Sequence, residues 1–286
     1  MKISRPLVVS SIFSKEPDSK TRSIVELSLE SMEIFFGRVE PDHEVFINRF
    51  RQSILNDLLE FDEVHKKHGG IKSFVCVDRS KLLVRWADMV RQDHRIKVNL
   101  RNRALVYLWI HDLSDRQYEY LGAALMKILG ASEIALTPRG NEFGIDFMAL
   151  VPAYSRSELF VSGGRGVRVV GQSKLYKSRV PRSSIQSFNN LMDSIRHNKY
   201  EIHKIVPAWF RNSPAPLMGL WAAHNGYQEG ARILSEQNGH ILLNTLMIAE
   251  VFGSAKALQN IATPEELERT FWSYLAEFEV KHQTLD

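Results

Sequence analysis

The sequence has almost none of the residues from which covalent or zinc cross-links are built. Cys76 is its one cysteine, so the chain can form no internal disulfide and no structural zinc site, which takes several thiolates. The ten histidines do not compensate, because none are spaced as the H-x-x-x-H or H-E-x-x-H pairs that bind catalytic zinc. We therefore expect a fold held together by packing in a reducing compartment.

Long hydrophobic runs are absent as well. No apolar stretch approaches the roughly 20 residues that span a bilayer. The N-terminus alternates charges with a short Leu-Val-Val run, which differs from a secretory signal. Repeats of fixed period and low-complexity segments are also missing. These absences predict a soluble cytoplasmic protein without membrane contact.

The composition that remains is that of an ordinary globular protein. Apolar residues make up 44% of the chain and charged residues 24%, which is enough to build a core. A length of 286 residues exceeds a typical single domain, so we expect two. The net charge of +4 is too small to identify a partner. Its distribution says more, because residues 161–182 carry six cations and no acid.

From about His111 onward, hydrophobic periodicity and turn residues predict an α/β domain. Ser114 begins a helix that ends near Gly130, and Pro181 suits the first turn of another. Short strands are predicted at 132–137, 144–151, 167–172 and 217–223, followed by a helix over 228–237. Thr263-Pro264 begins a last helix that runs to about Lys281.

The first 110 residues are less regular and predict a separate α+β module. A helix is expected over 42–68, with strands at 71–77 and 104–110. Between these strands, residues 91–103 carry five cations and one acid. Two interpretations stay open for this segment: a surface for nucleic acid, or a solvated loop or hairpin.

Two neighbouring predicted strands carry the residues with the most specific chemistry. Asp146 lies in the run FGIDFMALV, and Gln172-Ser173-Lys174 closes the run VRVVGQSKLY. Because side chains alternate along a strand, Gln172 and Lys174 project together. A carboxylate and an amide oxygen suit Mg²⁺, and a lysine can orient water and stabilise negative charge on a phosphate. The alternative is a purely structural Asp146–Lys174 bridge.

Gln172 brings no charge to such a site, so a further acid is expected. Glu119 on the preceding helix is the best candidate, although a solvated helix glutamate is an equal alternative. Glu142 is a weaker one. His224, after the fourth strand, is the one histidine expected near the cleft.

These segments resemble the catalytic domain of Mrr-like restriction endonucleases, a branch of the PD-(D/E)XK nuclease superfamily. The matching runs lie between Asp115 and about Leu243: YEYLGAALMKILG, TPRGNEFGIDFMAL, VVGQSKLYKSRV, IQSFNNLM and GYQEGARILSEQNGHILL. The resemblance implies a restriction-endonuclease-like α/β core, with a mixed central sheet flanked by helices. It implies metal ligation at Asp146 and Gln172, a catalytic Lys174, and Glu119 as the helix acid, with Mg²⁺ or Mn²⁺ as cofactor.

The resulting hypothesis is a metal-dependent DNA endonuclease, a restriction or other anti-invader effector. Residues 1–110 would select a target or protein partner, 111–245 would cut, and 246–286 would pack on the nuclease domain. Cutting both strands of a duplex needs two sites or two visits, so a homodimer is one of the two expected arrangements. Five cations are the expected DNA contacts: Arg165, Arg168, Lys177, Arg179 and Arg182. Two alternatives stay open: a non-catalytic nucleic-acid-binding or assembly subunit, and a repair or junction nuclease.

Overall fold

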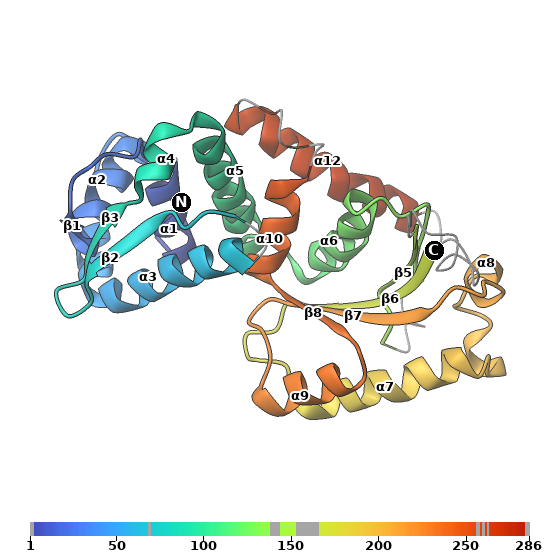
Figure 1. Ribbon diagram of the computed structural model, residues 1–286. Helices are drawn as coiled ribbons and strands as arrows, with labels where there is room; N and C mark the ends of the chain where they lie inside the picture. Colours follow the sequence, from blue (N-terminus) through green and yellow to red (C-terminus); the bar gives the residue numbers. More distant parts are fainter. Residues whose placement is uncertain are drawn as a thin grey trace. The chain divides into compact units, whose positions relative to one another are not determined.

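The computed structural model in Figure 1 describes residues 3–67, 70–137, 144–152, 166–255, 258, 261 and 263–283. The chain divides into two compact units. Unit 1 comprises Met1–Asp112 and Ala249–Leu267, and unit 2 comprises Leu113–Ile248 and Glu268–Asp286. The sequence assigned 246–286 as a whole to the nuclease domain, whereas the structure divides this segment between the two units.

Unit 1 combines helices with a small antiparallel sheet, as expected for an α+β module. Its strands pair in the order β1-β3-β2. Its elements are α1 (Arg5–Ser14), β1 (Arg22–Ser23), α2 (Ile24–Phe36), α3 (Pro41–Lys67), β2 (Phe74–Asp78), β3 (Leu83–Trp86), α4 (Asp88–Gln92) and α5 (His94–His111). The long helix α3 and the strand β2 agree with the sequence predictions for 42–68 and 71–77.

The predicted strand at 104–110 is wrong, because this segment is the second half of helix α5. Asp93 caps the start of this helix, because its carboxylate accepts hydrogen bonds from the backbone N–H groups of Arg95 and Ile96. Residues 104–108 are all buried, as is Ile110. A helix buried on nearly every side has no polar stripe, so the periodicity that would identify it is absent from the sequence.

Residues 94–103 belong to helix α5, so the interpretation of residues 91–103 as a solvated loop or hairpin is wrong. Arg103, one of the five cations of that segment, is buried and lies outside any nucleic-acid surface. Its side chain is 3% exposed and forms an ion pair of 2.6 Å with Glu250 of α10 (Thr245–Ser254). Glu250 also contacts His65 Nδ1 at 2.9 Å, and the Arg103 guanidinium lies 4.2 Å from the centre of the Phe61 ring. The arginine therefore joins three helices inside unit 1.

Unit 2 is built on a five-stranded mixed sheet of order β4-β5-β6-β7-β8. The pairs β4–β5 and β5–β6 are antiparallel, and the pairs β6–β7 and β7–β8 are parallel. The elements are α6 (Asp115–Ile128), β4 (Glu133–Leu136), β5 (Phe147–Pro152), β6 (Gly166–Lys174), α7 (Arg182–Arg196), η2 (Tyr200–Ile202), α8 (Ala208–Arg211), β7 (Leu217–Ala223), α9 (Glu229–Gln237) and β8 (Ile241–Asn244). The predicted mixed α/β sheet flanked by helices is confirmed, with β8 as an additional short strand.

Helices cover both faces of this sheet: α6 lies on one face, and α7 and α9 lie on the other (Figure 1). Helix α12 (Pro264–Gln283) begins where predicted, and the Thr263 hydroxyl accepts the backbone N–H of Glu266. On the α7 face, Met148 and Val170 of the strands share a core with Phe188 of α7. Among the described residues, no helix is long and apolar enough to cross a membrane.

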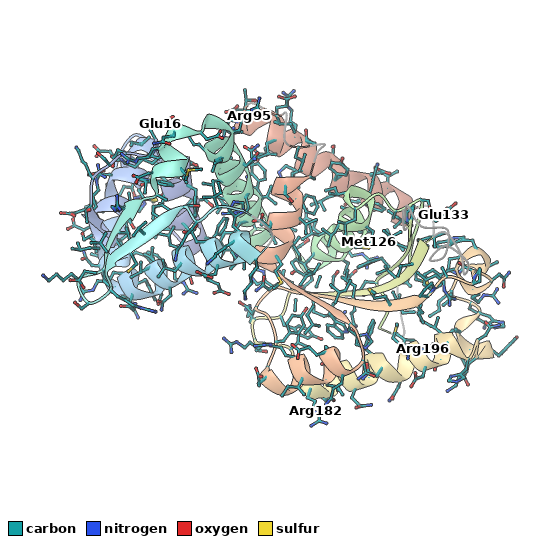
Figure 2. The ribbon with its side chains drawn as sticks, in the orientation of Figure 1. Glu16, Arg95, Met126, Glu133, Arg182 and Arg196 are labelled. Carbon is teal, nitrogen blue, oxygen red and sulfur yellow. The ribbon has the colours of Figure 1, made fainter. Side chains whose placement is uncertain are left out.

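Replacement of the buried arginine tests its structural role. Arg103→Ala leaves Glu250 buried without its guanidinium partner, and we expect the free energy of unfolding to fall by about 3–5 kcal/mol. The control is Arg95→Ala, because Arg95 is exposed near the start of the same helix (Figure 2); there we expect a change within about 0.5 kcal/mol. Urea unfolding measures the free energy of unfolding of both variants. Equal losses would contradict the structural role of Arg103.

Candidate active site

The register of β5 and β6 brings the motif residues together. Phe147 pairs with Gly171 and Met148 with Val170, so extending the ladder by one residue sets Asp146 opposite Gln172. The Asp146 backbone N–H donates to the Gly171 carbonyl at 2.9 Å, which continues the pairing. Directly opposed residues share a face of the sheet. Asp146, Gln172 and Lys174 therefore lie on the α7 face.

The Asp146 carboxylate is buried and held by two groups of β6. Its Oδ2 accepts the backbone N–H of Ser173 at 2.5 Å. Its Oδ1 lies 3.6 Å from Lys174 Nζ, and the exposed fractions of the two side chains are 0% for Asp146 and 20% for Lys174. The backbone contact fixes the carboxylate orientation, while the partly open lysine places a positive charge at the end of the central strand β6. The structure thus brings two of the predicted site residues into direct contact.

Gln172 lines a small cavity on the same face. Gly144 permits this position, because its φ of +80° is left-handed and a Cβ there would lie 3.3 Å from Gln172 Nε2. The cavity continues toward Ser184 and Phe188 of α7. The amide therefore points into a hollow beside the Asp146–Lys174 pair.

Two glycines allow helix and strands to approach closely under the site. A Cβ on Gly171 would lie 1.9 Å from the Phe147 ring, and a Cβ on Gly122 of α6 would lie 2.3 Å from the same ring. Phe147 follows Asp146 directly and is fully buried. The aromatic ring thus fills the space left by both glycines and anchors the start of β5.

His224 lies beside the end of β6, as the sequence predicted it would approach this region. Its backbone N–H donates to the Lys174 carbonyl at 3.0 Å. The Thr245 hydroxyl is 3.0 Å from His224 Nδ1 and donates to the His224 carbonyl at 3.2 Å. Burial lowers the pKa of His224 below its usual value, so the imidazole is neutral at neutral pH.

Glu119 occupies a different setting from the other predicted site residues. It lies on α6, the helix over the opposite face from Asp146, and forms an ion pair with Arg116 one turn earlier. Neighbouring Tyr118 is buried, with its ring 6.1 Å from that of His224. Within the part of the chain that the structure describes, no group of three acids, histidines or cysteines could hold a metal ion.

The predicted DNA-binding cations differ in their surroundings. Lys177, Arg179 and Arg182 are exposed after β6, and Arg182 extends from the start of α7 (Figure 2). Arg168 instead donates to the backbone carbonyls of Ala215 and Phe210 at 2.8 and 3.1 Å. Arg168 therefore stabilises the region around its own strand. Arg165 and Glu142 lie outside the described residues.

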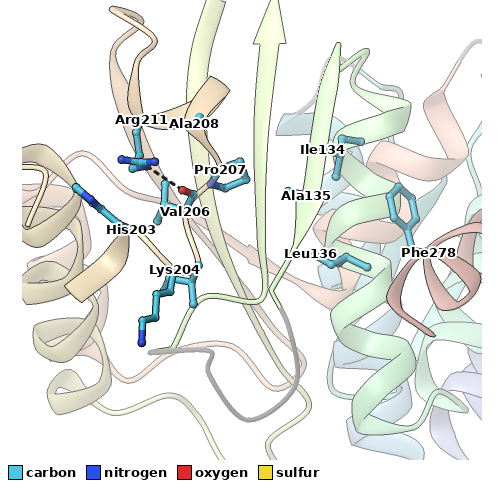
Figure 3. Close-up of a pocket in the computed structure, with 11 residues that line it drawn as sticks. Ile134, Ala135, Leu136, His203, Lys204, Val206, Pro207, Ala208, Arg211 and Phe278 are labelled. Carbon is cyan, nitrogen blue, oxygen red and sulfur yellow. Dashed lines mark hydrogen bonds between the residues drawn. The ribbon is translucent and has the colours of Figure 1, made fainter. Parts of the chain in front are cut away.

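A larger cavity of about 490 Å³ borders the edge strand β4 (Figure 3). Its lining includes Leu136, Pro207 and Phe278. None of the predicted site residues contributes to it. Size would favour this cavity as the ligand site, but of the predicted site residues Gln172 lines the smaller hollow, and the Asp146–Lys174 pair lies on the same face of the sheet.

A single methyl group tests the packing beneath the site. Gly171→Ala forces its Cβ into the Phe147 ring, and we expect the free energy of unfolding to fall by about 1–3 kcal/mol. Gly230→Ala on α9 is the control, because its Cβ meets its nearest neighbour at 3.6 Å and alanine favours a helix by up to about 1 kcal/mol. Thermal or urea unfolding measures both variants. An unchanged free energy of unfolding for Gly171→Ala would contradict the packing argument.

Comparison with known structures gives low overall similarity. MspJI restriction endonuclease in complex with a 27-mer oligonucleotide matches 69% of this chain with 12% identity and a TM-score of 0.37. FokI restriction endonuclease matches 93% of it in the DNA-bound structure, with 14% identity and a TM-score of 0.37, and 93% in a second structure, with 13% identity and a TM-score of 0.35. This chain spans 46% of each of these solved chains.

The sequence family gives the more specific finding. A search of curated proteins finds no match to this chain. Residues 110–205 match the family described as "Restriction endonuclease", Mrr_cat. This range includes Glu119, Asp146, Gln172 and Lys174. The resemblance to Mrr-like restriction endonucleases that the motifs indicated is therefore confirmed over residues 110–205.

Proposed function

We propose that unit 2 is a DNA endonuclease that hydrolyses phosphodiester bonds with Mg²⁺ or Mn²⁺. The observation that carries the proposal is the 3.6 Å contact between Asp146 Oδ1 and Lys174 Nζ, on the face of the sheet to which Gln172 also belongs. The restriction endonuclease match over 110–205 supports it. An acid, an amide and a lysine at one strand end are the groups that metal-assisted hydrolysis requires.

The donor atoms at this position suit a hard divalent cation. Asp146 supplies one carboxylate and Gln172 an amide oxygen, and Mg²⁺ accepts one or two carboxylates because it retains several waters. When bound, such an ion neutralises phosphate charge and lowers the pKa of a bound water. A single negative charge among these ligands favours weak binding, with the substrate phosphate completing the site.

Other groups of the chain orient the carboxylate, position the water and fix the end of the strand. The Ser173 backbone N–H holds the Asp146 carboxylate in one orientation. Lys174, partly exposed, orients the attacking water and stabilises negative charge that develops on the phosphate. The His224 backbone holds the Lys174 carbonyl and so fixes the end of the strand.

Glu119 enters the proposal as a secondary acid. Its carboxylate already pairs with Arg116 on α6, so its contribution requires a change of partner when DNA binds. Glu119→Gln would therefore reduce cleavage less than substitution of Asp146.

The wider role follows from the two-unit organisation. Unit 1 selects a DNA target or a protein partner, and unit 2 cuts, in a cytoplasmic restriction or anti-invader defence effector. Cutting both strands of a duplex favours a homodimer. Two alternatives use the same surface: a repair or junction nuclease, and a non-catalytic subunit that binds nucleic acid with the same basic surface.

Plasmid nicking in Mg²⁺ or Mn²⁺ tests the catalytic assignment. Asp146→Asn and Lys174→Ala should each reduce cleavage about a hundredfold or more, because each removes charge at the reacting phosphate. Asp193→Asn is the control, because Asp193 is an exposed acid of α7 paired with Arg196. Its cleavage should equal that of the wild type.

Two results would change the assignment. Intact plasmid together with salt-sensitive DNA binding by the wild type would favour the non-catalytic subunit. Full cleavage by Asp146→Asn would place the chemistry elsewhere in the chain.

The salt dependence of DNA binding tests whether the basic segment after β6 contacts DNA. Lys177→Ala, Arg179→Ala and Arg182→Ala should weaken binding for all sequences and lower the slope of log K against log salt by about 0.9 for each phosphate that the variant no longer neutralises. Arg232→Ala, an exposed arginine of α9 paired with Glu229, should leave the slope unchanged. Equal slopes for all four variants would exclude this segment from the DNA path.

A further inference from the structure

The small cavity beside the Asp146–Lys174 pair has a composition that sets it apart from a phosphate site. It has a volume of about 180 Å³ and opens between the sheet and α7. Its lining residues are Gly144, Gln172, Tyr176, Ser184, Ser187, Phe188, Leu191 and Trp221. None of them carries a charge. A phosphate group would enter this hollow without a cation to balance it.

The polar groups of the lining suit the edge of a nucleobase. The Gln172 amide nitrogen, which the proposed metal does not use, donates hydrogen bonds, and the hydroxyls of Ser184 and Tyr176 donate or accept them. Bases present neutral donors and acceptors of the same kind along their edges. The lining therefore matches a base in charge and in hydrogen-bonding capacity.

The apolar groups suit the flat faces of a ring. The buried rings of Phe188 and Trp221, whose centres are 5.5 Å apart, lie on the inner side with Leu191. At roughly 30 Å³ per water, the cavity has the volume of about six waters, which is the scale of a single planar ring system. A whole nucleotide is too large for it.

The cations lie just outside the cavity. Lys177 follows Tyr176 directly in the chain, and Arg182 lies two residues before Ser184. Both are exposed. This arrangement suits a DNA strand whose phosphates follow the charged surface while one of its bases enters the neutral cavity.

We propose that this cavity accepts one base of the cleaved DNA strand, rotated out of the helical stack beside the scissile phosphate. The inference rests on the proposed function, because DNA must reach Asp146 for the base to reach Gln172. It defines the substrate class more narrowly: DNA in which a base near the cut is unpaired, mismatched or easily unstacked. Such a base costs less to extrude than one in a fully paired duplex.

Fluorescence of 2-aminopurine tests the inference without requiring cleavage. Duplexes carrying this base at successive positions, each opposite a mismatch, are titrated with the full-length protein in Ca²⁺ in place of Mg²⁺. The base brightens when it leaves the stack, so we expect a several-fold rise confined to one or two neighbouring positions. In Mg²⁺, the mismatched duplex should be cut about tenfold faster or more than the paired one.

Filling the cavity provides the decisive variant. Ser184→Leu places an isobutyl group in the hollow and should abolish the fluorescence rise, while Ser187→Leu offers a second filling position if the first fails to fold. Ser183→Leu is the matched control, because Ser183 is its exposed neighbour on α7 and does not line the cavity. The control should retain the rise.

The outcomes separate this inference from the proposed function. A localised rise that Ser184→Leu abolishes supports the cavity even if no DNA is cut, in which case the endonuclease proposal fails alone. Cleavage without a rise, or a rise that Ser184→Leu leaves intact, overturns the base pocket and leaves the endonuclease standing. Absence of DNA binding overturns both.

Discussion

The antiparallel pairing of β5 with β6 at Phe147 and Gly171 is the contact on which the rest of unit 2 depends. It sets Asp146 opposite Gln172 and brings the carboxylate to the backbone N–H of Ser173. A slip of one residue would turn Asp146 toward α6 and away from Lys174. The Phe147 ring occupies the space above Gly171 and Gly122, so the register is held by packing as well as by hydrogen bonds.

This register divides the sheet into two faces with different tasks. The α7 face carries the Asp146–Lys174 pair and the neutral cavity at Gln172. The α6 face carries buried packing, including Phe147 against Gly122. The larger cavity at β4 contains none of the predicted site residues. Chemistry at a strand end, and not cavity size, therefore identifies the candidate site, because hydrolysis depends on a few groups held at short distance.

Much of the fold and of the candidate site could be predicted from local patterns. Ser114 caps α6 in a capping box, and α7 begins directly after Pro181. Asp146 and Lys174 could be paired because alternation along a strand and a two-strand motif are properties of short segments. Helix α5 could not be predicted, since its residues 104–108 are buried on every side and its composition favours a strand.

The sequence by itself determined the order of the main elements of unit 2 from α6 to α9, the Asp146 and Gln172-Lys174 motif, and the basic segment that follows it. Only the tertiary structure decided which charges serve the interior. It pairs Arg103 with Glu250 and ties Arg168 to the backbone carbonyls of Ala215 and Phe210. The physical reason is that hydrogen-bond geometry along a strand is local, whereas the burial and pairing of a charge depend on residues far away in the chain.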